Sequence, residues 1–592
     1  LPDYIDARAG ANTQLPRLDF NNISDFGGSY PAITDKSNTF EYRAAMTTIM
    51  GSHSFKYGWQ ERRNLFASSG YGSSTGYFTF RRDWTRASNT DTVSSNHALD
   101  WAAFMMGVPQ TQYIDYNDSA YWRMPRRALY FQDDWRLTNK LRLSLGLRYE
   151  FEGGIGERVN RGIAAPIFNE ASPITSMVET AYAANPLPDL AASAFKATGI
   201  TRYLGVDGFN ATNKGVNWLL PKFGIVYSLN SKTVIRGGWG MYADTQNVAN
   251  SRPNQTGYSL ATSTPISNDS GLTFCCGTGA AAGLSTAHNP MADPFPVRAA
   301  SGNTRFDDPY GNTLGGLARY GNGWDTLNWD FKPALQHRWR IGFQREVARN
   351  TMVDVSYNGS YSYLPVLTRD NYLPQQYWST GNARNSANET YLTTNFKNPY
   401  NIKNLTGLAS SNPSLYQWAS GNSFFTNTNM ARQQLLRPMS MYGTIRTYGR
   451  IGEDSWNGYV KYHDVSVLLE RRFTGGFQST FMYTYANSRT ADWMANEFDA
   501  APTERANNNV MPHRIAWSAV YETPFGKGRK FVSDGPMAHV IGNWNVSWVY
   551  QLQSGPVAYD WSNRFFYGDI NKIGDLWKHV EVRSKDYLQW FD

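Results

Sequence analysis

The feature of this chain that most constrains its fold is an unbroken alternation of apolar and polar residues over residues 141–152. The apolar positions are Leu141, Leu143, Leu145, Leu147, Tyr149 and Phe151. Because successive side chains of a β-strand point to opposite faces, one face of this segment is wholly apolar. A strand that crosses a bilayer at a tilt needs roughly 9–11 residues, which this segment provides. The pattern therefore predicts a membrane-spanning strand with one face toward lipid.

The same alternation recurs along the chain, as a barrel built from such strands requires. The apolar sides of the further segments are Phe223, Ile225, Tyr227 and Leu229, then Trp339, Ile341 and Phe343, then Phe477, Phe481, Tyr483 and Tyr485, then Ile515, Trp517, Ala519 and Tyr521, and last Trp544, Val546, Trp548, Tyr550 and Leu552. Aromatic residues gather near the ends of these segments, where a transmembrane barrel carries its interfacial girdles.

The connections between the expected strands alternate between short and long. Short turns that carry Gly, Asn or Ser are expected at residues 51–52, 138–140, 230–232, 348–350 and 474–476. Long loops are expected at about residues 152–221, 243–335, 360–458 and 488–512. Such loops are uncommon in compact soluble domains, whereas outer-membrane barrels combine short periplasmic turns with long extracellular loops. We therefore predict an all-β fold, a transmembrane antiparallel β-barrel with about seven hairpins and about 14 strands.

The composition agrees with a barrel and argues against nucleic-acid binding. Aromatic residues make up 15% of the chain and charged residues only 18%, which suits an aromatic outer face and a mostly uncharged lumen. The same totals also fit a secreted carbohydrate-binding β protein, so composition does not decide. The net charge of +8 comes from 56 basic and 48 acidic residues that are scattered along the chain. Since nucleic-acid binding needs a concentrated basic surface, we expect none.

Motifs for catalysis or for a bound cofactor are weak. The segment PFGKGRK (residues 524–530) lacks the spacing of a phosphate loop and lies between two expected strands, so we interpret it as a glycine-rich turn. The eight histidines are dispersed. Cys275 and Cys276 are adjacent, which favours a vicinal disulfide in a loop, because a zinc site takes more protein ligands than this pair offers. We expect no enzymatic activity, no cofactor and no metal site.

Within this pattern, residues 127–151 (RALYFQDDWRLTNKLRLSLGLRYEF) resemble the barrel of Oar-like TonB-dependent receptors. That family tends to carry an aromatic-Gln-Asp-Asp-Trp strand, a short turn and then L-x-L-G-L-R-Y-E. Similar segments follow in the order of the family at residues 38–60, 221–242, 336–360, 465–488 and 513–531. This collinear order makes the resemblance specific.

The resemblance implies a protein with an N-terminal carboxypeptidase-regulatory-like β-sandwich, a plug domain and a barrel of about 22 strands. It also implies a location in the outer membrane of a Gram-negative-type bacterium. We expect residues 1–37 to be a loop or linker leading into the barrel, and residues 38–592 to be the barrel itself. The barrel is expected to be incomplete at both ends, with about 14 of about 22 strands, and with the sandwich, the plug and the TonB box outside this chain.

The long loops are the expected ligand surface. Aromatic residues beside Asn, Gln and Ser offer flat apolar faces and hydrogen-bond partners, which suit sugars or peptides. The candidate ligand-binding residues are Trp324, Trp329, Tyr377, Trp378, Tyr416, Trp418, Tyr442, Arg446 and Arg450. The competing interpretation is that these aromatic residues pack the loops against one another.

The resemblance implies active uptake, in which a scarce oligosaccharide, peptide or metal chelate binds the extracellular loops. The expected partners are outer-membrane lipid, an extracellular small ligand or glycan, and the TonB complex, which acts through a plug that this chain lacks. One alternative is a surface adhesion or organising protein without transport, and another is a soluble carbohydrate-binding β protein. A plug and a TonB box upstream would favour uptake, whereas their absence would favour adhesion.

Overall fold

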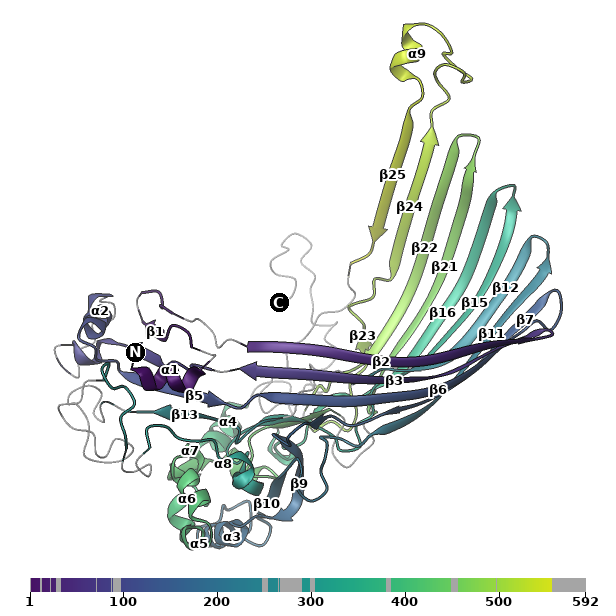
Figure 1. Ribbon diagram of the computed structural model, residues 1–592. Helices are drawn as coiled ribbons and strands as arrows, with labels where there is room; N and C mark the ends of the chain where they lie inside the picture. Colours follow the sequence, from purple (N-terminus) through teal and green to yellow (C-terminus); the bar gives the residue numbers. More distant parts are fainter. Residues whose placement is uncertain are drawn as a thin grey trace.

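The dominant element of the computed structural model is one large, strongly curved antiparallel sheet (Figure 1). The structure describes residues 2–10, 13–21, 23–27, 33–70, 72–86, 88, 97–246, 254–264, 266, 290–298, 304–378, 385–448, 456–496 and 498–555. Twelve long strands follow one another across this sheet in chain order. They are β2 (Ile33–Met50), β3 (His53–Gly70), β6 (Ala120–Trp135), β7 (Leu141–Glu152), β11 (Val216–Asn230), β12 (Thr233–Ala243), β15 (Leu335–Ala348), β16 (Thr351–Leu364), β21 (Gly458–Thr474), β22 (Phe477–Ala491), β24 (His513–Glu522) and β25 (Asn545–Gln553).

Each long strand pairs antiparallel with its neighbours in the chain, so the predicted all-β antiparallel fold is confirmed. The two-residue strands β8 (Gly156–Glu157) and β23 (Arg505–Ala506) attach to β6 and β22. The described residues form six hairpins of long strands, against an expectation of about seven. In that part of the chain β2 and β25 are the edges of the sheet, and the strand number of the whole barrel stays a prediction.

The predicted division into short turns and long loops holds for five of the six hairpins, and the sixth turn, residues 523–544, is long. At one end of the sheet, hairpin turns cover residues 51–52, 136–140, 231–232, 349–350 and 475–476. Gly51, Asn350 and Gly475 have φ angles of +61°, +60° and +58°, the left-handed conformation that tight hairpin turns use. Long connections at the other end cover residues 71–119, 153–215, 244–334, 365–457 and 492–512.

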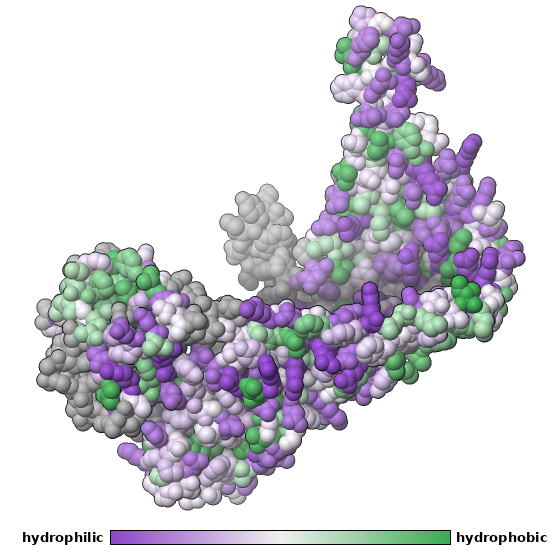
Figure 2. Space-filling view, viewed as in Figure 1, coloured by the Kyte–Doolittle hydropathy of each residue, from purple (hydrophilic) through white to green (hydrophobic). Residues whose placement is uncertain are grey.

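The two faces of the sheet differ in chemistry through its middle. One row of side chains across β7, β11, β12 and β15 consists of Leu145, Phe223, Trp239 and Trp339. The adjacent row on the opposite face consists of Gly146, Lys222, Gly240 and Arg338. Leu145 and Phe223 are 41% and 42% exposed, and apolar faces this extensive are stable only against a non-aqueous phase. Hydrophilic residues line the inner side of the curve (Figure 2).

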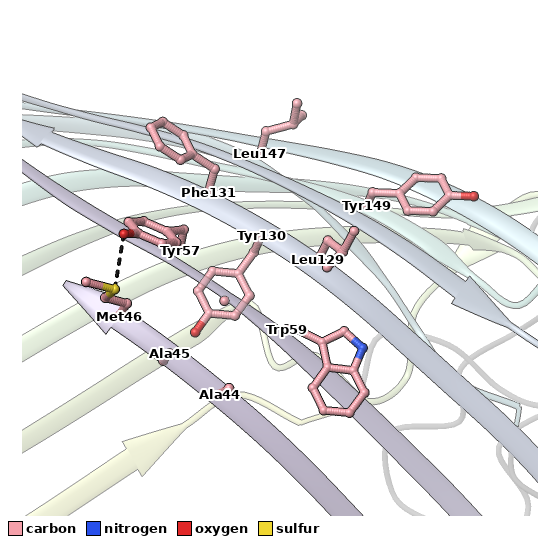
Figure 3. Close-up of a pocket in the computed structure, with 11 residues that line it drawn as sticks. Ala44, Ala45, Met46, Tyr57, Trp59, Leu129, Tyr130, Phe131, Leu147 and Tyr149 are labelled. Carbon is pink, nitrogen blue, oxygen red and sulfur yellow. Dashed lines mark hydrogen bonds between the residues drawn. The ribbon is translucent and has the colours of Figure 1, made fainter. Parts of the chain in front are cut away.

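A hollow of about 640 Å³ lies over β2, β3, β6 and β7 (Figure 3). The side chains around it are largely aromatic or aliphatic, among them Met46, Tyr57, Trp59, Leu129 and Phe131. These five residues belong to the apolar face of the sheet. The hollow is therefore part of the surface that needs a non-aqueous phase, rather than a polar binding site.

A small second sheet lies beside the long-loop end of the large one (Figure 1). Its strands are β1 (Arg17–Phe20), β4 (Tyr77–Phe80), β5 (Thr111–Asn117) and β13 (Ser259–Ser263), and the nearby helices are α1 (Asp3–Ala9), η2 (Arg82–Trp84) and α2 (His97–Met105). Its core includes Ile5, Phe20, Phe78, Ile114 and Phe295. The residues before β2 thus contribute a helix and a strand to this unit.

The remaining long connections fold into a compact unit that we name the loop cap, made of the described residues of 153–215, 304–334 and 365–448. Its strands are β9 (Ile163–Ala171), β10 (Thr198–Tyr203), β14 (Trp324–Leu327), β17 (Leu367–Arg369), β18 (Asn395–Lys397), β19 (Asn429–Ala431) and β20 (Ile445–Tyr448). Its helices are α3 (Thr175–Ala183), η5 (Gly311–Leu317), η6 (Gln375–Tyr377), α4 (Ser386–Thr393), η7 (Ile402–Asn404), α5 (Thr406–Ser411), α6 (Pro413–Ser420), α7 (Ser423–Thr426) and α8 (Arg432–Leu436). A last helix, α9 (Pro536–Ile541), lies at the opposite end of the sheet (Figure 1). Within the described residues, no helix is long and apolar enough to span a membrane.

Replacing Leu147 by Arg tests which face of the sheet meets lipid. Leu147 is exposed on the apolar face, so we expect Leu147→Arg to destabilise the folded protein in bilayers by about 2–4 kcal/mol. Ser144→Arg, on the polar face of the same strand, should cost much less because that side chain can pair with Asp134, which Ser144 contacts at 2.6 Å. Urea titration followed by heat-modifiable gel mobility measures both. Equal losses would contradict the assignment of the faces.

Replacing Gly359 by Val tests the packing of an aromatic ring over a strand glycine. A Cβ atom at Gly359 would lie 2.3 Å from the Trp339 indole, which covers this glycine from the paired strand. Overpacking of this kind should destabilise the sheet by about 1–3 kcal/mol. Gly342→Ala is the matched control, since its Cβ would meet Ser356 at an ordinary 3.5 Å. The same unfolding assay should separate the two variants, and equal stability would show that Trp339 can move freely.

Candidate functional site: the loop cap and the polar face

The loop cap has a hydrophobic core of its own. Buried side chains of all three of its segments meet there, for example Tyr182 from the first, Leu317 from the second, and Leu392 and Phe425 from the third. Helices α3 to α8 lie together at the long-loop end of the sheet (Figure 1). A core assembled from segments far apart in the sequence holds the loops as one body over that end.

Three buried tyrosines lie at the centre of the cap. The Tyr320 ring is edge-on to Tyr400 and Tyr442, with ring centroids 6.4 Å and 5.3 Å away. The Tyr320 hydroxyl donates to the Gly199 carbonyl at 2.6 Å, and the Tyr400 hydroxyl lies 2.7 Å from Ser440 Oγ. Burial raises the pKa of all three hydroxyls above the ordinary value. They therefore stay neutral and act in packing rather than as acids or bases.

Asn371 organises the polar part of the cap. Its Nδ2 donates to the carbonyls of Met439, Tyr442 and Gly443 at 2.9, 3.0 and 2.9 Å. Its Oδ1 accepts from the Met439 N–H at 3.0 Å, and its carbonyl accepts from Arg437 at 2.6 Å. The side chain is fully buried, so these bonds satisfy backbone groups that water does not reach. The side-chain amide thereby binds the backbone at residues 439, 442 and 443.

Two of the predicted ligand-binding residues lie within the cap core. Trp324 is 6% exposed and Tyr442 is 0% exposed. The Trp324 ring also lies 5.8 Å from the Arg319 guanidinium, which further encloses it. In this arrangement both side chains pack the loops together, and a binding role for them stays a prediction that requires the cap to open.

Four other predicted residues, Tyr377, Trp378, Tyr416 and Trp418, surround the core and are half-buried. Trp378 Nε1 donates to the Leu373 carbonyl at 2.7 Å, and its ring is edge-on to Phe498 at 5.3 Å. Trp418 is edge-on to Phe425 at 5.5 Å. These rings combine packing contacts with partial exposure, so their role in binding stays a prediction.

The remaining predicted residues lie apart from this group. Trp329 is edge-on to Phe209 at 4.9 Å. Arg446 forms a two-point ion pair with Asp325, at 2.6 and 2.7 Å, which joins the parallel strands β14 and β20. The hydrogen bond to that carboxylate raises the pKa of the Arg446 guanidinium.

Arg450, like Cys275 and Cys276, lies outside the described residues. Among the residues that are described, no three His, Cys, Asp or Glu side chains gather as a metal site would require.

The polar face of the sheet carries a second candidate surface that the sequence patterns did not single out. A cavity of about 590 Å³ opens over β7, β11, β12, β15 and β16. In it, two cations lie close to the Tyr242 ring, with Lys222 Nζ at 4.5 Å and the Arg338 guanidinium at 5.4 Å from its centroid. A Cβ at Gly240 would lie 3.3 Å from that ring, so the missing side chain gives the ring room. We name this cavity the basic basin; its chemistry suits anionic or hydroxyl-rich ligands.

A network of ion pairs lies beside the basic basin. Glu150, which is almost fully buried, accepts from Arg126 and from Arg148, the second at 2.6 Å. Arg148 also donates to Gln60 at 2.8 Å. Because a buried charge is costly unless it is paired, these residues hold one another in place. Their alternation in sequence indicated a polar face, but only the strand register brings them together.

A family model described as "Outer membrane beta barrel domain" matches residues 4–564 of this chain. The chain belongs to the outer-membrane β-barrel domain family. It is therefore an outer-membrane barrel protein, with the apolar face of the sheet toward lipid and the polar face toward the lumen. By the general rule for such barrels, the short turns are periplasmic, and the loop cap lies on the extracellular side.

Solved structures that this barrel chain partly resembles are transport proteins and receptors by title. They are the copper transporter OprC (10% identity, 83% of this chain and 42% of that chain, TM-score 0.35), the outer membrane transporter YddB from Escherichia coli (9%, 92% and 51%, 0.37) and the siderophore receptor PiuA from Acinetobacter baumannii (9%, 88% and 49%, 0.33). The chain spans about half of their length or less. At this level of likeness their substrates do not transfer to this chain. No curated protein matches it.

Replacing Asn371 by Leu tests whether the loop cap is held together by its polar centre. Loss of the amide leaves buried backbone groups without partners, each of which costs about 1–3 kcal/mol. We expect Asn371→Leu to expose the cap to proteolysis while the heat-modifiable mobility of the barrel stays unchanged. Asn429→Leu, at an exposed position in β19, is the matched control. A cap as resistant as in the unchanged protein would contradict the role given to Asn371.

Proposed function

We propose that this chain is the barrel part of an Oar-like TonB-dependent receptor, which takes up a scarce substrate across the outer membrane. The observation that carries this proposal is the combination of a folded loop cap at one end with a charged, cavity-bearing lumen face. Anchoring in lipid alone requires only the apolar face. The paired charges around Glu150 and the basic basin are features that a passage for a polar solute would use.

The substrate class that fits these surfaces is an oligosaccharide, a peptide or a metal chelate. The half-buried rings of Tyr377, Trp378, Tyr416 and Trp418 supply flat apolar faces on the cap, which suit sugars and peptides. The cations of the basic basin add attraction for carboxylate-rich or chelate ligands. Energy would come from the TonB complex acting through a plug domain.

A surface adhesion protein is the second candidate, and one observation favours it. The cap has its own core, which gives a rigid outer surface of the kind that contacts a matrix or a neighbouring cell. Adhesion, however, makes no use of a charged lumen face. A soluble carbohydrate-binding protein does not fit the family to which the chain belongs.

The test of uptake is a transport assay on cells that express the complete protein, with panels of oligosaccharides, peptides and metal chelates. We expect uptake of one class, lost when the proton gradient is collapsed or TonB is deleted. Trp378→Ala and Trp418→Ala should each weaken ligand binding about tenfold. Trp59→Ala, on the lipid-facing side, serves as the control and should leave binding unchanged. Binding of cells or matrix without uptake of any solute would favour adhesion instead.

A further inference from the structure

We propose that the turn between β24 and β25, residues 523–544, is an anchor that binds the periplasmic surface of the lipid bilayer. It inserts apolar side chains between lipids and places lysines against lipid phosphates. The other turns at this end span two to five residues, whereas this one spans 22. In Figure 1 it projects beyond the ends of the other hairpins and carries α9. Since a hairpin needs only a few residues to reverse the chain, the added length needs another explanation.

Backbone hydrogen bonds and a close contact between two glycines hold this turn in a defined conformation. Gly526 N–H donates to the Phe531 carbonyl at 3.1 Å, and Phe531 N–H donates to the Pro524 carbonyl at 3.0 Å. The backbone then crosses itself at two glycines, because a Cβ on Gly526 would lie 2.5 Å from the Cα of Gly542. Only glycine allows that approach, so the PFGKGRK segment serves to close a compact protrusion.

One side of this protrusion is apolar and uncovered. Met537, Val540 and Trp544 are 56%, 62% and 60% exposed. Met537 and Val540 are three residues apart in α9 and so share a face. Trp544 Nε1 donates to the Val540 carbonyl at 2.8 Å, which holds the indole against the last turn of the helix. The three side chains therefore form one surface, which we name the apolar tip.

The apolar tip continues the lipid-facing surface of the barrel. In β25 the lipid-facing side chains alternate as Val546, Trp548, Tyr550 and Leu552, opposite Tyr521, Ala519, Trp517 and Ile515 of β24. Trp544 lies two residues before Val546 and therefore continues the same row. Its carbonyl accepts a hydrogen bond from the Thr523 N–H at 2.8 Å, directly beyond the last strand pair, Glu522 and Asn545. It thus lies at the end of a lipid-facing column, at the level where membrane proteins place Trp among headgroups.

The charges around the apolar tip suit a surface of lipid phosphates. The turn carries Lys527, Arg529, Lys530 and His539 against a single acid, Asp534. Arg529 pairs with Glu522 of β24 at 3.0 Å. In the described part of the chain, no carboxylate forms an ion pair with Lys527 or Lys530, and Lys530 lies 5.3 Å from the Phe531 ring. Apolar side chains beside lysines are the combination by which short helices bind membrane surfaces.

The test uses the protein with Cys275→Ser and Cys276→Ser, labelled with the fluorophore NBD at Met537→Cys, in vesicles of phosphatidylethanolamine and phosphatidylglycerol. We expect a blue-shifted emission, quenching by doxyl-labelled lipids, and loss of quenching by iodide. Tyr550→Cys, on the lipid-facing side of β25, is the positive control, and Ser533→Cys in the same turn is the aqueous control. Val540→Cys reports on the same surface where the label at position 537 disturbs folding.

The lysines are tested in the same assay with Lys527→Gln and Lys530→Gln. Each lost charge should shift the turn from the lipid-bound toward the aqueous state about fivefold. Labels at 537 and 540 that behave like the one at 533 would overturn the proposal. It would also be overturned if these labels became protected only on addition of a periplasmic extract, since a protein partner would then cover the tip.

Discussion

Every backbone N–H and carbonyl within lipid must find its partner inside the protein, and the rest of this structure depends on that constraint. The strands between β2 and β25 meet it by pairing on both sides over long registers, of which the β2–β3 register, from Ile33 opposite Gly70 to Met50 opposite His53, is an example. Once the strands are paired, alternate side chains point to opposite faces of the sheet, one toward lipid and the other toward the lumen. The row through Leu145 therefore faces lipid, and the row through Gly146 faces the lumen.

Beyond the lipid, water can satisfy backbone groups, and the long connections obey a different rule. They bury apolar side chains in a core that joins three distant segments, with Asn371 as its polar centre. Aromatic residues that the sequence suggested as ligand contacts contribute to this core. Trp324 and Tyr442 are buried in this core, whereas Trp378 and Trp418 are only partly buried against it.

The charged side chains of the lumen face and of the periplasmic turn lie at specific positions. Inside the barrel, Glu150 is held by Arg126 and Arg148, while Lys222 and Arg338 flank Tyr242 in the basic basin. At the periplasmic end, the turn of residues 523–544 combines exposed apolar side chains with lysines where the lipid-facing column ends. The cations of the lumen face and those of the turn thus lie in different surroundings, inside the barrel and at its periplasmic end.

The sequence by itself determined half of the long strands, most of their turns and the two faces, because these follow from local alternation and turn residues. It placed the turn at 475–476 and predicted the polar side of β7 without knowledge of any neighbour. It could not determine that Lys222 and Arg338 would flank one ring, or that Tyr442 would be buried. Those facts depend on strand register and on contacts between segments more than a hundred residues apart. Only the tertiary structure decides them, because burial depends on the assembled neighbours and not on the residue itself.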